Sequence, residues 1–347
     1  MRNVPLGKDD SISEIMLGTM TFGTQTPEAE SHAQIDMACD AGVTWLDTAE
    51  MYPVNPIRPE TTGLTETIIG NWIAKGNGGR IRVATKHSGE GAHARDGAPI
   101  SADTIPQAVE GSLKRLQSNT IDLYQFHWPN RGSFQFRQNW TYRPKGDLAA
   151  IQQNMADCMG ALEAEVARGT IRAFGLSNES TWGMDQWLTL ATTEDGGDGP
   201  ARPVSIQNEY SVLFREPDTD LSEMMTYEQV TILAFSPLAT GLVTGKYQNG
   251  AIPDGSRRSI NPGLGGRWSD RVEGVVDVYL DLAQAHGVDP VHMALAWLQT
   301  RPFACSAILG ATTLAQLEHG LKAQDLTLSD ELVTAIDAAN RAHPMPY

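Results

Sequence analysis

Short apolar runs alternate with longer helical patterns along almost the whole chain, and this alternation restricts the possible folds more than any other feature. Eight runs have the length and composition of buried strands, at 15–19, 43–48, 81–86, 121–127, 171–176, 204–207, 230–235 and 307–310. Segments with helical periodicity follow them, at 28–40, 64–74, 103–116, 151–168, 182–190, 221–227, 271–285 and 313–323. Alternation of this kind is typical of parallel strands joined by right-handed crossovers. Eight repeats predict an α/β fold, a (β/α)8 TIM barrel.

Three segments lie outside this repeat. Residues 2–14 predict an N-terminal hairpin, and 290–299 and 329–341 predict two extra helices. A barrel of this class takes about 250 residues plus insertions, so residues 1–347 are expected to form a single domain. An open doubly wound sheet is the alternative that the alternation leaves open.

Composition narrows the class of function. The net charge of −16 argues against nucleic-acid binding, and no apolar window is long enough to span a membrane. The N-terminus has no apolar stretch of the kind found in a signal peptide, and the three cysteines are far apart, which predicts a reduced cytoplasmic protein. A phosphate-bearing ligand would therefore need a local cluster of cations and amides.

Barrels of this kind carry their chemistry on the loops that follow the strands. Asp47 lies at the end of the second strand and Tyr52 follows it, while Lys86 ends the third strand and His127 ends the fourth. Each of these residues taken alone could serve only to stabilise the fold. Together, however, all four would meet around one barrel mouth. An ammonium beside a phenol is expected to lower its pKa, a carboxylate would fix the ammonium, and a histidine would hydrogen-bond a carbonyl oxygen. This set suits carbonyl reduction.

The later strand ends suit a nicotinamide dinucleotide. Ser177, Asn178 and Gln207 offer partners for a carboxamide, and Phe235 offers a ring for stacking. The segment 236–247, with Lys246, suits a pyrophosphate, with further charge from Arg257 and Arg258. Residues 310–313 open a helix, where free amides attract phosphate.

Two rival signals are weaker. The segment 89–94 matches GxGxxA after a strand, but no apolar helix follows it. The histidines form no HExxH motif, and a predicted turn separates His286 from His292, so no metal site is predicted.

Seven stretches resemble the aldo-keto reductases, most closely their bacterial Tas-like branch, and the resemblance covers nearly the whole chain. They are WLDTAEMY, IRVATK, LYQFHWP, FGLSN, IQNEYS, FSPLATG and LGATT. The resemblance implies a catalytic tetrad of Asp47, Tyr52, Lys86 and His127, with Tyr52 as proton donor. It also implies NADPH, rather than NADH, held across the barrel mouth without a Rossmann domain.

The resemblance assigns cofactor contacts along the whole dinucleotide. The carboxamide would meet Ser177, Asn178 and Gln207, and the ring would lie on Phe235. The pyrophosphate would meet Ser236, Leu238, Gly241 and Lys246. The adenosine 2'-phosphate end would meet the residues that follow Gly310, namely Thr312, Thr313 and Gln316, together with Arg257. Gly18, Thr19 and Met20 would contact the cofactor from the side of the first strand. Gln316 stands where many members have Arg, and His319-Gly320 stands where they have Glu-Asn. Both departures fall at the adenosine end, so the preference for NADPH over NADH stays open.

A long loop, 128–147, is expected to bear on the substrate. It begins at Trp128 and holds Phe134, Phe136, Trp140 and Tyr142, which would either line a pocket for apolar carbonyl compounds or pin the loop to the rim. Trp128 and Trp140 are the predicted substrate contacts.

Two rival functions use the same residues. Lys86 could be the nucleophile of a Schiff-base aldolase. The chain could also be a cofactor-sensing regulatory subunit resembling potassium-channel β subunits. The natural substrate, the direction of reaction in the cell and the oligomeric state do not follow from the sequence.

Overall fold

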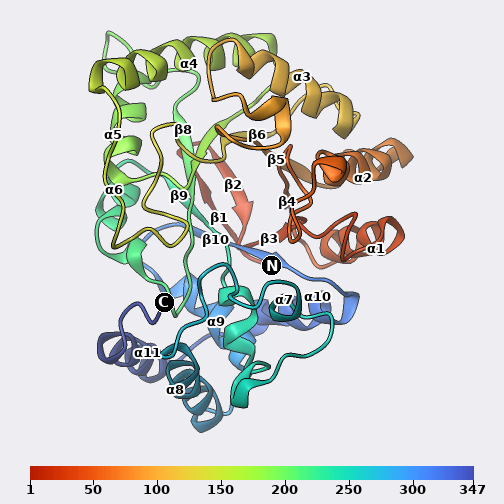
Figure 1. Cartoon of the computed structure of the whole chain (residues 1–347), viewed down its shortest axis with the longest axis vertical. Coiled ribbons are helices and arrows are strands. Elements are labelled where there is room, and N and C mark those ends of the chain that lie inside the picture. Colours follow the sequence, from red (N-terminus) through yellow and green to blue (C-terminus); the bar gives the residue numbers. More distant parts are fainter.

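Eight parallel strands close into a barrel in the computed structural model, which describes residues 1–347 (Figure 1). The order around the barrel is β10-β3-β4-β5-β6-β7-β8-β9. The strands are β3 (Ile15–Gly18), β4 (Trp45–Asp47), β5 (Arg82–His87), β6 (Leu123–Phe126), β7 (Phe174–Ser177), β8 (Pro203–Gln207), β9 (Thr231–Ala234) and β10 (Cys305–Gly310). The predicted (β/α)8 barrel is confirmed, and the open sheet is excluded because β10 pairs with both β3 and β9.

Helices surround the barrel and bury its outer face. They are α1 (Glu28–Asp40), α2 (Leu64–Trp72), α3 (Thr104–Leu116), α4 (Leu148–Arg168), α5 (Thr181–Leu190), α6 (Leu221–Tyr227), the one-turn α7 (Arg257–Ile260), α8 (Val272–Ala285), α9 (Pro290–Trp297), α10 (Leu314–Leu321) and α11 (Asp330–Ala342). No helix combines the length and apolar content that crossing a bilayer requires.

The roles of two helices differ from the prediction. The sequence pattern placed 271–285 inside the repeat and 290–299 outside it. In the structure α9 packs against both α8 and α10, while α8 also packs against α11 at the edge of the molecule (Figure 1). The apolar content of α9 explains the difference, because six of its eight residues are buried, including Met293 and Trp297. A helix covered on nearly every side belongs between other elements.

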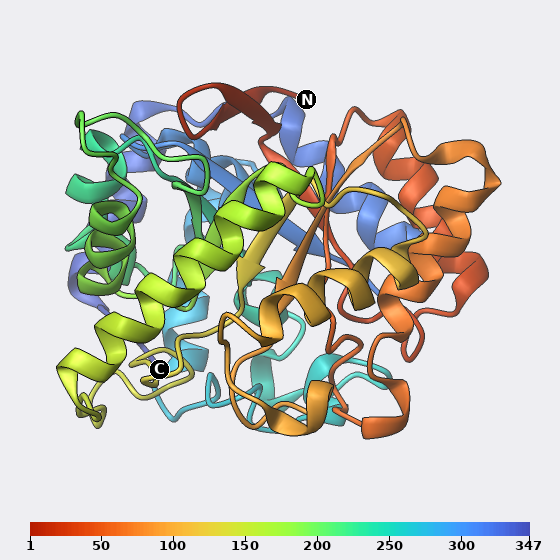
Figure 2. The same ribbon diagram turned by 90° about the horizontal axis from the view of Figure 1, so that it is seen from above.

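The N-terminal hairpin closes one end of the barrel. Strands β1 (Asn3–Leu6) and β2 (Asp10–Ser13) pair antiparallel, and Leu6 and Ile12 pack with Met16 and Trp45 in the barrel interior. Burial of Leu6 and of Ile12 contributes about 1.5–3 kcal/mol each to the free energy of unfolding. Figure 2 shows the hairpin at one end and the long loops after the strands at the other. The loop end is therefore the open mouth.

Helix caps set the observed boundaries. The carboxylate of Asp147 accepts a hydrogen bond from the amide of Ala150 at 2.9 Å, so α4 begins three residues before the predicted start at Ile151. Ser180 caps α5 and Ser329 caps α11 in the same way. An oxygen acceptor at the N-cap satisfies an amide that has no partner within the helix.

The contact between α2 and α3 depends on one glycine, and a second glycine provides a matched comparison. A Cβ on Gly70 would lie 2.1 Å from the carbonyl oxygen of Arg115, whereas a Cβ on the exposed Gly160 of α4 would meet nothing within 4 Å. We predict that Gly70→Ala lowers the free energy of unfolding by about 1–3 kcal/mol, because the helices must move apart. Gly160→Ala should raise it by about 0.5–1 kcal/mol through helix propensity. Urea denaturation measures both, and an unchanged midpoint in Gly70→Ala would contradict the close packing.

Candidate active site

Four polar side chains from three neighbouring strand ends meet at the open mouth. Asp47 is the last residue of β4, Lys86 lies near the end of β5 and His127 follows β6, while Tyr52 is in the loop after β4. Parallel pairing of β4, β5 and β6 brings these ends side by side. The structure therefore brings together the four residues that the sequence selected.

A buried ion pair is the base of the site. Lys86 Nζ lies 2.8 Å from Asp47 Oδ1 and 2.9 Å from Oδ2, and it donates to the carbonyl oxygen of Thr48 at 2.7 Å. The side chain of Lys86 is fully buried and that of Asp47 is 5% exposed. From the opposite side of the barrel, Gln207 Nε2 donates to Asp47 Oδ1 at 2.8 Å. Three oxygen atoms therefore surround the Lys86 ammonium, so its charge is fixed in one place.

Tyr52 lies over this ion pair with its ring facing Lys86. The ring centroid is 5.0 Å from Lys86 Nζ and 5.7 Å from the His127 ring. Burial raises the pKa of Tyr52 above its usual value, the Asp47 charge raises it further, and Arg257 lowers it. The expectation that Lys86 lowers this pKa is wrong for this structure, because the carboxylate of Asp47 offsets the ammonium charge and the phenol is desolvated.

His127 is held neutral. Burial lowers its pKa well below the usual value, and the charge of Lys86 lowers it further. Its Nδ1 is buried without a hydrogen-bond partner, and its backbone oxygen accepts from Asn178 Nδ2 at 2.8 Å. A neutral imidazole beside Tyr52 can donate one N–H to an oxygen placed between them.

The next two strand ends form a polar shelf beside the tetrad. Ser177 Oγ donates to the carbonyl oxygen of Gln207 at 2.9 Å, while Asn178 adopts a left-handed backbone conformation with φ of 54°. Asn178 Oδ1 is buried and has no partner, which fits an amide ligand that supplies an N–H. Gln207 was expected at the carboxamide, but its Nε2 is committed to Asp47.

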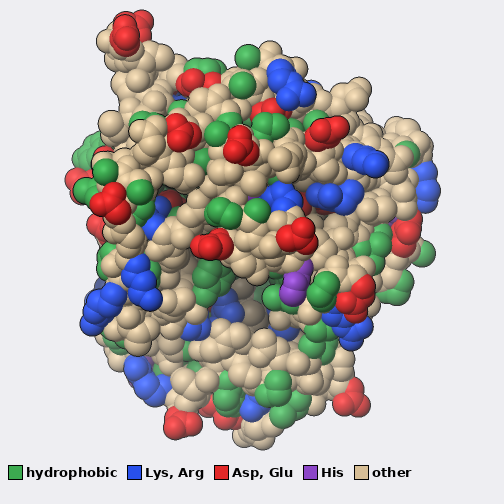
Figure 3. Space-filling view, turned by 45° about the horizontal axis from the view of Figure 1, so that its top comes forward, with side chains coloured by type: hydrophobic (Ala, Val, Ile, Leu, Met, Phe, Trp, Pro, Cys, Tyr) green, Lys and Arg blue, Asp and Glu red, His purple; other side chains and the backbone are tan.

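The segment after β9 has the irregular backbone of an anion site. Ser236, Ala239, Thr240 and Gly241 all have positive φ, at 52°, 47°, 56° and 93°. A Cβ on Gly241 would lie 2.8 Å from Lys246 Cε, so the lysine side chain lies against the bare backbone. The predicted pyrophosphate residues Ser236, Leu238, Gly241 and Lys246 thus share one loop. Figure 3 shows a hollow on one face of the molecule with Lys and Arg side chains within it.

Arg257 affects the pKa of two groups at the mouth, Tyr52 and Lys246. Its pKa is lowered first by burial and then by Arg267, while Tyr52 acts on it in the opposite direction. Burial lowers the pKa of Lys246, and Arg257 lowers it further. No carboxylate is among the groups that affect either pKa. Arg257 thus affects the pKa of both Lys246 and Tyr52, and its predicted place at the adenosine end stays a prediction.

The expected adenosine end contains an acidic group that the sequence did not reveal. Thr313 Oγ1 caps α10 by accepting from Gln316 N at 3.2 Å, and Gln316 Oε1 accepts from Thr312 N at 3.0 Å. Glu30 Oε1, from α1, accepts from Leu314 N at 3.2 Å. A carboxylate thus occupies part of the anion-binding start of α10. Only the packing of α1 against α10 places it there.

Residues at the end of the first barrel strand, β3, contact the backbone of the tetrad residue Asp47. Thr19 Oγ1 donates to the backbone oxygen of Asp47 at 2.8 Å, and the carbonyl oxygen of Met20 accepts from Val54 at 3.1 Å. A Cβ on Gly18 would lie 2.8 Å from Ile308 Cγ2, and Gly18 pairs with Gly310. These residues border the mouth on the side where the sequence placed the cofactor.

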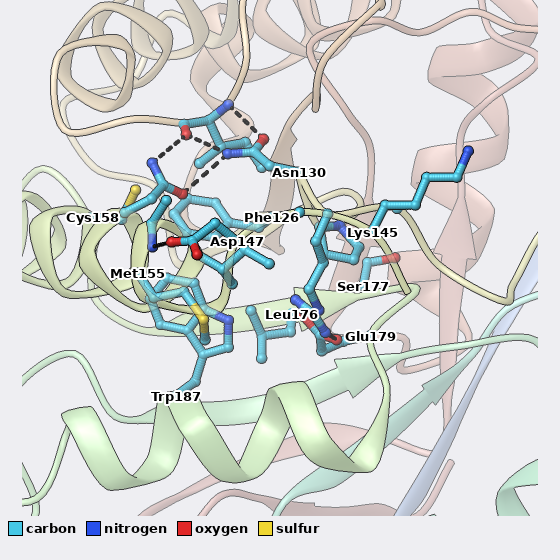
Figure 4. Close-up of a pocket in the computed structure, with 18 residues that line it drawn as sticks. Phe126, Asn130, Lys145, Asp147, Met155, Cys158, Leu176, Ser177, Glu179 and Trp187 are labelled. Atoms are coloured by element: carbon cyan, nitrogen blue, oxygen red, sulfur yellow. Dashed lines mark hydrogen bonds and ion pairs between the residues drawn. The ribbon is translucent and has the colours of Figure 1, made fainter. Parts of the chain in front are cut away.

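The loop 128–147 forms one wall of the mouth, but not all of its aromatic residues line that wall. The Trp128 ring lies 4.9 Å from the His127 ring and 6.3 Å from Phe136. Trp140 is 77% exposed, so it does not line a pocket in this structure. A cavity of about 480 Å³ lies beneath the loop, lined by α4 residues such as Met155 and by Trp187 of α5 (Figure 4). None of the four tetrad residues lines this cavity, although Ser177 of the polar shelf does.

The GxGxxA match at 89–94 does not form a dinucleotide fold. Gly89 is packed against the indole of Trp128, where a Cβ would lie 2.1 Å from Nε1. The segment leads into the short 3-10 helix Ala94–Gly97, and the helix N-terminus that would bind pyrophosphate is missing.

A group of possible metal ligands lies away from the mouth, where the sequence predicted none. Asp289, His292 and His319 place one ligand atom each within 4.8 Å of the others. Hydrogen bonds already account for the group: Asp289 caps α9, His292 Nε2 contacts the carbonyl oxygen of His319 at 2.7 Å, and His319 Nε2 lies 3.2 Å from Asp289. We assign it to the contact between α9 and α10.

Comparisons with known proteins agree with this architecture. The model of the Aldo/keto reductase family matches residues 14–341. Protein tas of Escherichia coli is 40% identical over 343 residues, covering 96% of each chain. The uncharacterized oxidoreductase YrpG of Bacillus subtilis is 29% identical, covering 94% of this chain and 91% of its own. Human aflatoxin B1 aldehyde reductase member 2 is 28% identical, covering 94% of this chain and 85% of its own.

The family match spans the barrel and every strand end that carries a tetrad residue, and the identity to a relative of nearly equal length is well above the level at which only a fold is shared. The chain therefore belongs to the aldo/keto reductase family of oxidoreductases.

Proposed function

We propose that this protein is an NADPH-dependent carbonyl reductase in which Tyr52 donates the proton. The observation that carries the proposal is the buried Asp47–Lys86 pair beneath Tyr52, with neutral His127 beside the phenol. Residues 1–347 would act as one catalytic domain, with 128–147 as its substrate loop. The unpaired cysteines suit a reducing compartment such as the cytoplasm.

The residues at the mouth fit a nicotinamide dinucleotide. The unpartnered Asn178 Oδ1 would accept from the carboxamide, Phe235 would contact the ring, and Lys246 with the 236–241 backbone would hold the pyrophosphate. When bound, the nicotinamide supplies a hydride to the carbonyl carbon.

The chain's own residues then handle the oxygen and the proton. The substrate oxygen would lie between the hydroxyl of Tyr52 and an N–H of His127, which stabilise the negative charge that develops on it. Tyr52 releases its proton to that oxygen, and the tyrosinate that remains faces the Lys86 ammonium 5.0 Å from its ring. The raised pKa of Tyr52 keeps the phenol protonated until the alkoxide forms.

The aldolase alternative requires a free amine, and Lys86 does not offer one. Its Nζ has three oxygen partners and no exposure to solvent. The regulatory alternative uses the same cofactor site and differs only in turnover. Tight NADPH binding without reduction of any carbonyl compound would favour it.

The role of Tyr52 is tested by removing one oxygen atom. Tyr52→Phe should lower kcat for carbonyl reduction by about 10²–10⁴-fold, because the proton donor is lost, while NADPH affinity stays within twofold. Tyr227→Phe, at a tyrosine that is 77% exposed, is the matched control and should retain full activity. Near-normal turnover in Tyr52→Phe would contradict the assignment.

The pH profile tests the charge states of the site. Because the pKa of His127 is lowered and that of Tyr52 is raised, neither group changes charge near neutrality. We expect kcat to stay constant between about pH 6 and pH 8. An inflection near pH 6.5, the usual pKa of histidine, that disappears in His127→Asn would show that His127 titrates and would refute the neutral assignment.

The cofactor preference depends on the start of α10. Glu30 and Gln316 should weaken binding of the 2'-phosphate of NADPH, because one repels it and the other offers no charge. Glu30→Gln and Gln316→Arg should each increase the ratio of NADPH to NADH affinity by about 2- to 10-fold, consistent with charge effects of about 0.3–1 kcal/mol or slightly more at a helix N-terminus. Tryptophan fluorescence titration with both cofactors measures the ratio. Equal effects on NADPH and NADH would contradict a contact with the 2'-phosphate.

A further inference from the structure

One buried carboxylate at the mouth binds three segments that are far apart in the sequence. Glu209, just after β8, has a fully buried side chain. Its Oε1 accepts from Arg267 Nε at 2.8 Å and from the hydroxyl of Tyr347 at 3.2 Å. Its Oε2 accepts from Arg267 Nη2 at 2.7 Å and from Arg137 Nη2. Arg137 belongs to the loop 128–147, Arg267 follows α7, and Tyr347 lies after α11.

Aromatic rings strengthen the same junction. The Arg137 guanidinium lies 4.6 Å from the Phe214 ring and 5.1 Å from the Tyr347 ring. These two rings are parallel to within 5°, with centroids 6.0 Å apart. Cation–π contacts of this kind add attraction when water is excluded. Figure 2 shows the C-terminal end beside the loop 128–147.

The two loops also contact each other directly. Gly266 has φ of 86°, and a Cβ there would lie 2.5 Å from Arg137 Cγ. At its other side the loop 128–147 reaches the polar shelf, where Ser133 Oγ donates to the carbonyl oxygen of Asn178 at 2.7 Å. The loop 128–147 therefore spans from Asn178 to the segment 257–267 that carries Arg257.

The links to Glu209 are unequal. Arg267 makes two hydrogen bonds to the carboxylate and a third to the carbonyl oxygen of Leu264 at 3.1 Å. Arg137 makes one, and its Nη1 is buried without a partner. If Arg137 leaves, Glu209 is still neutralised by a bidentate arginine, so this link can open without leaving a buried charge unpaired.

We propose that Glu209, Arg137, Arg267 and Tyr347 form a clasp that joins the substrate loop 128–147 to the cofactor segment 257–267. The inference rests on the proposed function, because it assigns the two segments to substrate and cofactor. Glu209 is a positioning residue in this arrangement. The Arg137 link opens first, and the dinucleotide leaves only after the loop 128–147 has moved.

The test measures dissociation of NADPH by stopped flow, with excess NADP⁺ as the chase. Arg137→Ala, which lies on the substrate side, should increase the dissociation rate at least tenfold. Arg143→Ala, at an exposed arginine of the same loop, should leave it within twofold. The urea midpoint of cofactor-free Arg137→Ala should fall by less than that of Arg267→Ala, because Arg267 still pairs with Glu209 when Arg137 is removed.

A double variant separates coupling from two independent contacts. Arg137→Ala with Arg267→Ala should release NADPH no faster than the faster single variant, because either change opens the clasp. If the dissociation rate of the double variant increased by the product of the two single increases, the two contacts would be independent and the proposal would be overturned. If Arg137→Ala does not fold, Arg137→Lys tests the same link and should release NADPH at least threefold faster.

The two hypotheses fail in different ways. Wild-type protein that does not bind NADPH would overturn the proposed function and the clasp with it. Wild-type protein that binds NADPH, with dissociation unchanged in Arg137→Ala, would overturn the clasp alone.

Discussion

The buried ion pair of Asp47 and Lys86 is the constraint on which the rest of the mouth depends. Removal of two charges from water costs several kcal/mol per ion, and short bonds to every proton and lone pair must offset that cost. Lys86 contacts both carboxylate oxygens of Asp47 and the Thr48 carbonyl oxygen, and Asp47 gains a further donor from Gln207 across the barrel. Three strands are thereby locked in register around one charge pair. Tyr52 then has a fixed surface to lie on, which a reaction needing ångström-level placement requires.

Local charge at the mouth opposes the charge of the whole chain. A net charge of −16 repels a dinucleotide at long range, yet Lys246 and Arg257 have no carboxylate among the groups that act on their pKa. These unpaired cations create a local positive potential, opposite in sign to the net charge of the chain. Salt screens the long-range repulsion by the net charge over about 8–10 Å. Glu30 reverses the sign again at the start of α10. The local charge therefore favours an anion near Lys246 and Arg257 more than one at the start of α10.

The sequence predicts those parts of this site that depend on strand order alone. Asp47, Lys86 and His127 each follow a buried apolar run, and in a parallel barrel such positions must converge. The direction of the Tyr52 pKa was wrong because it depends on how closely Asp47 neutralises Lys86 and on how deeply the phenol is buried. Glu30 and Glu209 could not be selected, because a glutamate on a helix or after a strand looks like any solvated one. Only packing between distant elements gives them their roles, and the same holds for α9, whose burial depends on α8 and α10.

Asp47 and Glu209, two of the buried carboxylates at the mouth, differ in the number of cations that neutralise them. Asp47 has one partner of full charge, so breaking that pair would leave an unpaired charge in a dry site at a cost of about 3–5 kcal/mol. Glu209 has two arginines, so one can leave while the other keeps the carboxylate neutralised. The first arrangement suits a group that must stay in place through every catalytic cycle. The second suits a junction that opens and closes, because each state retains a paired carboxylate. The number of neutralising cations therefore distinguishes the fixed ion pair at β4 from the proposed opening of the clasp beside β8.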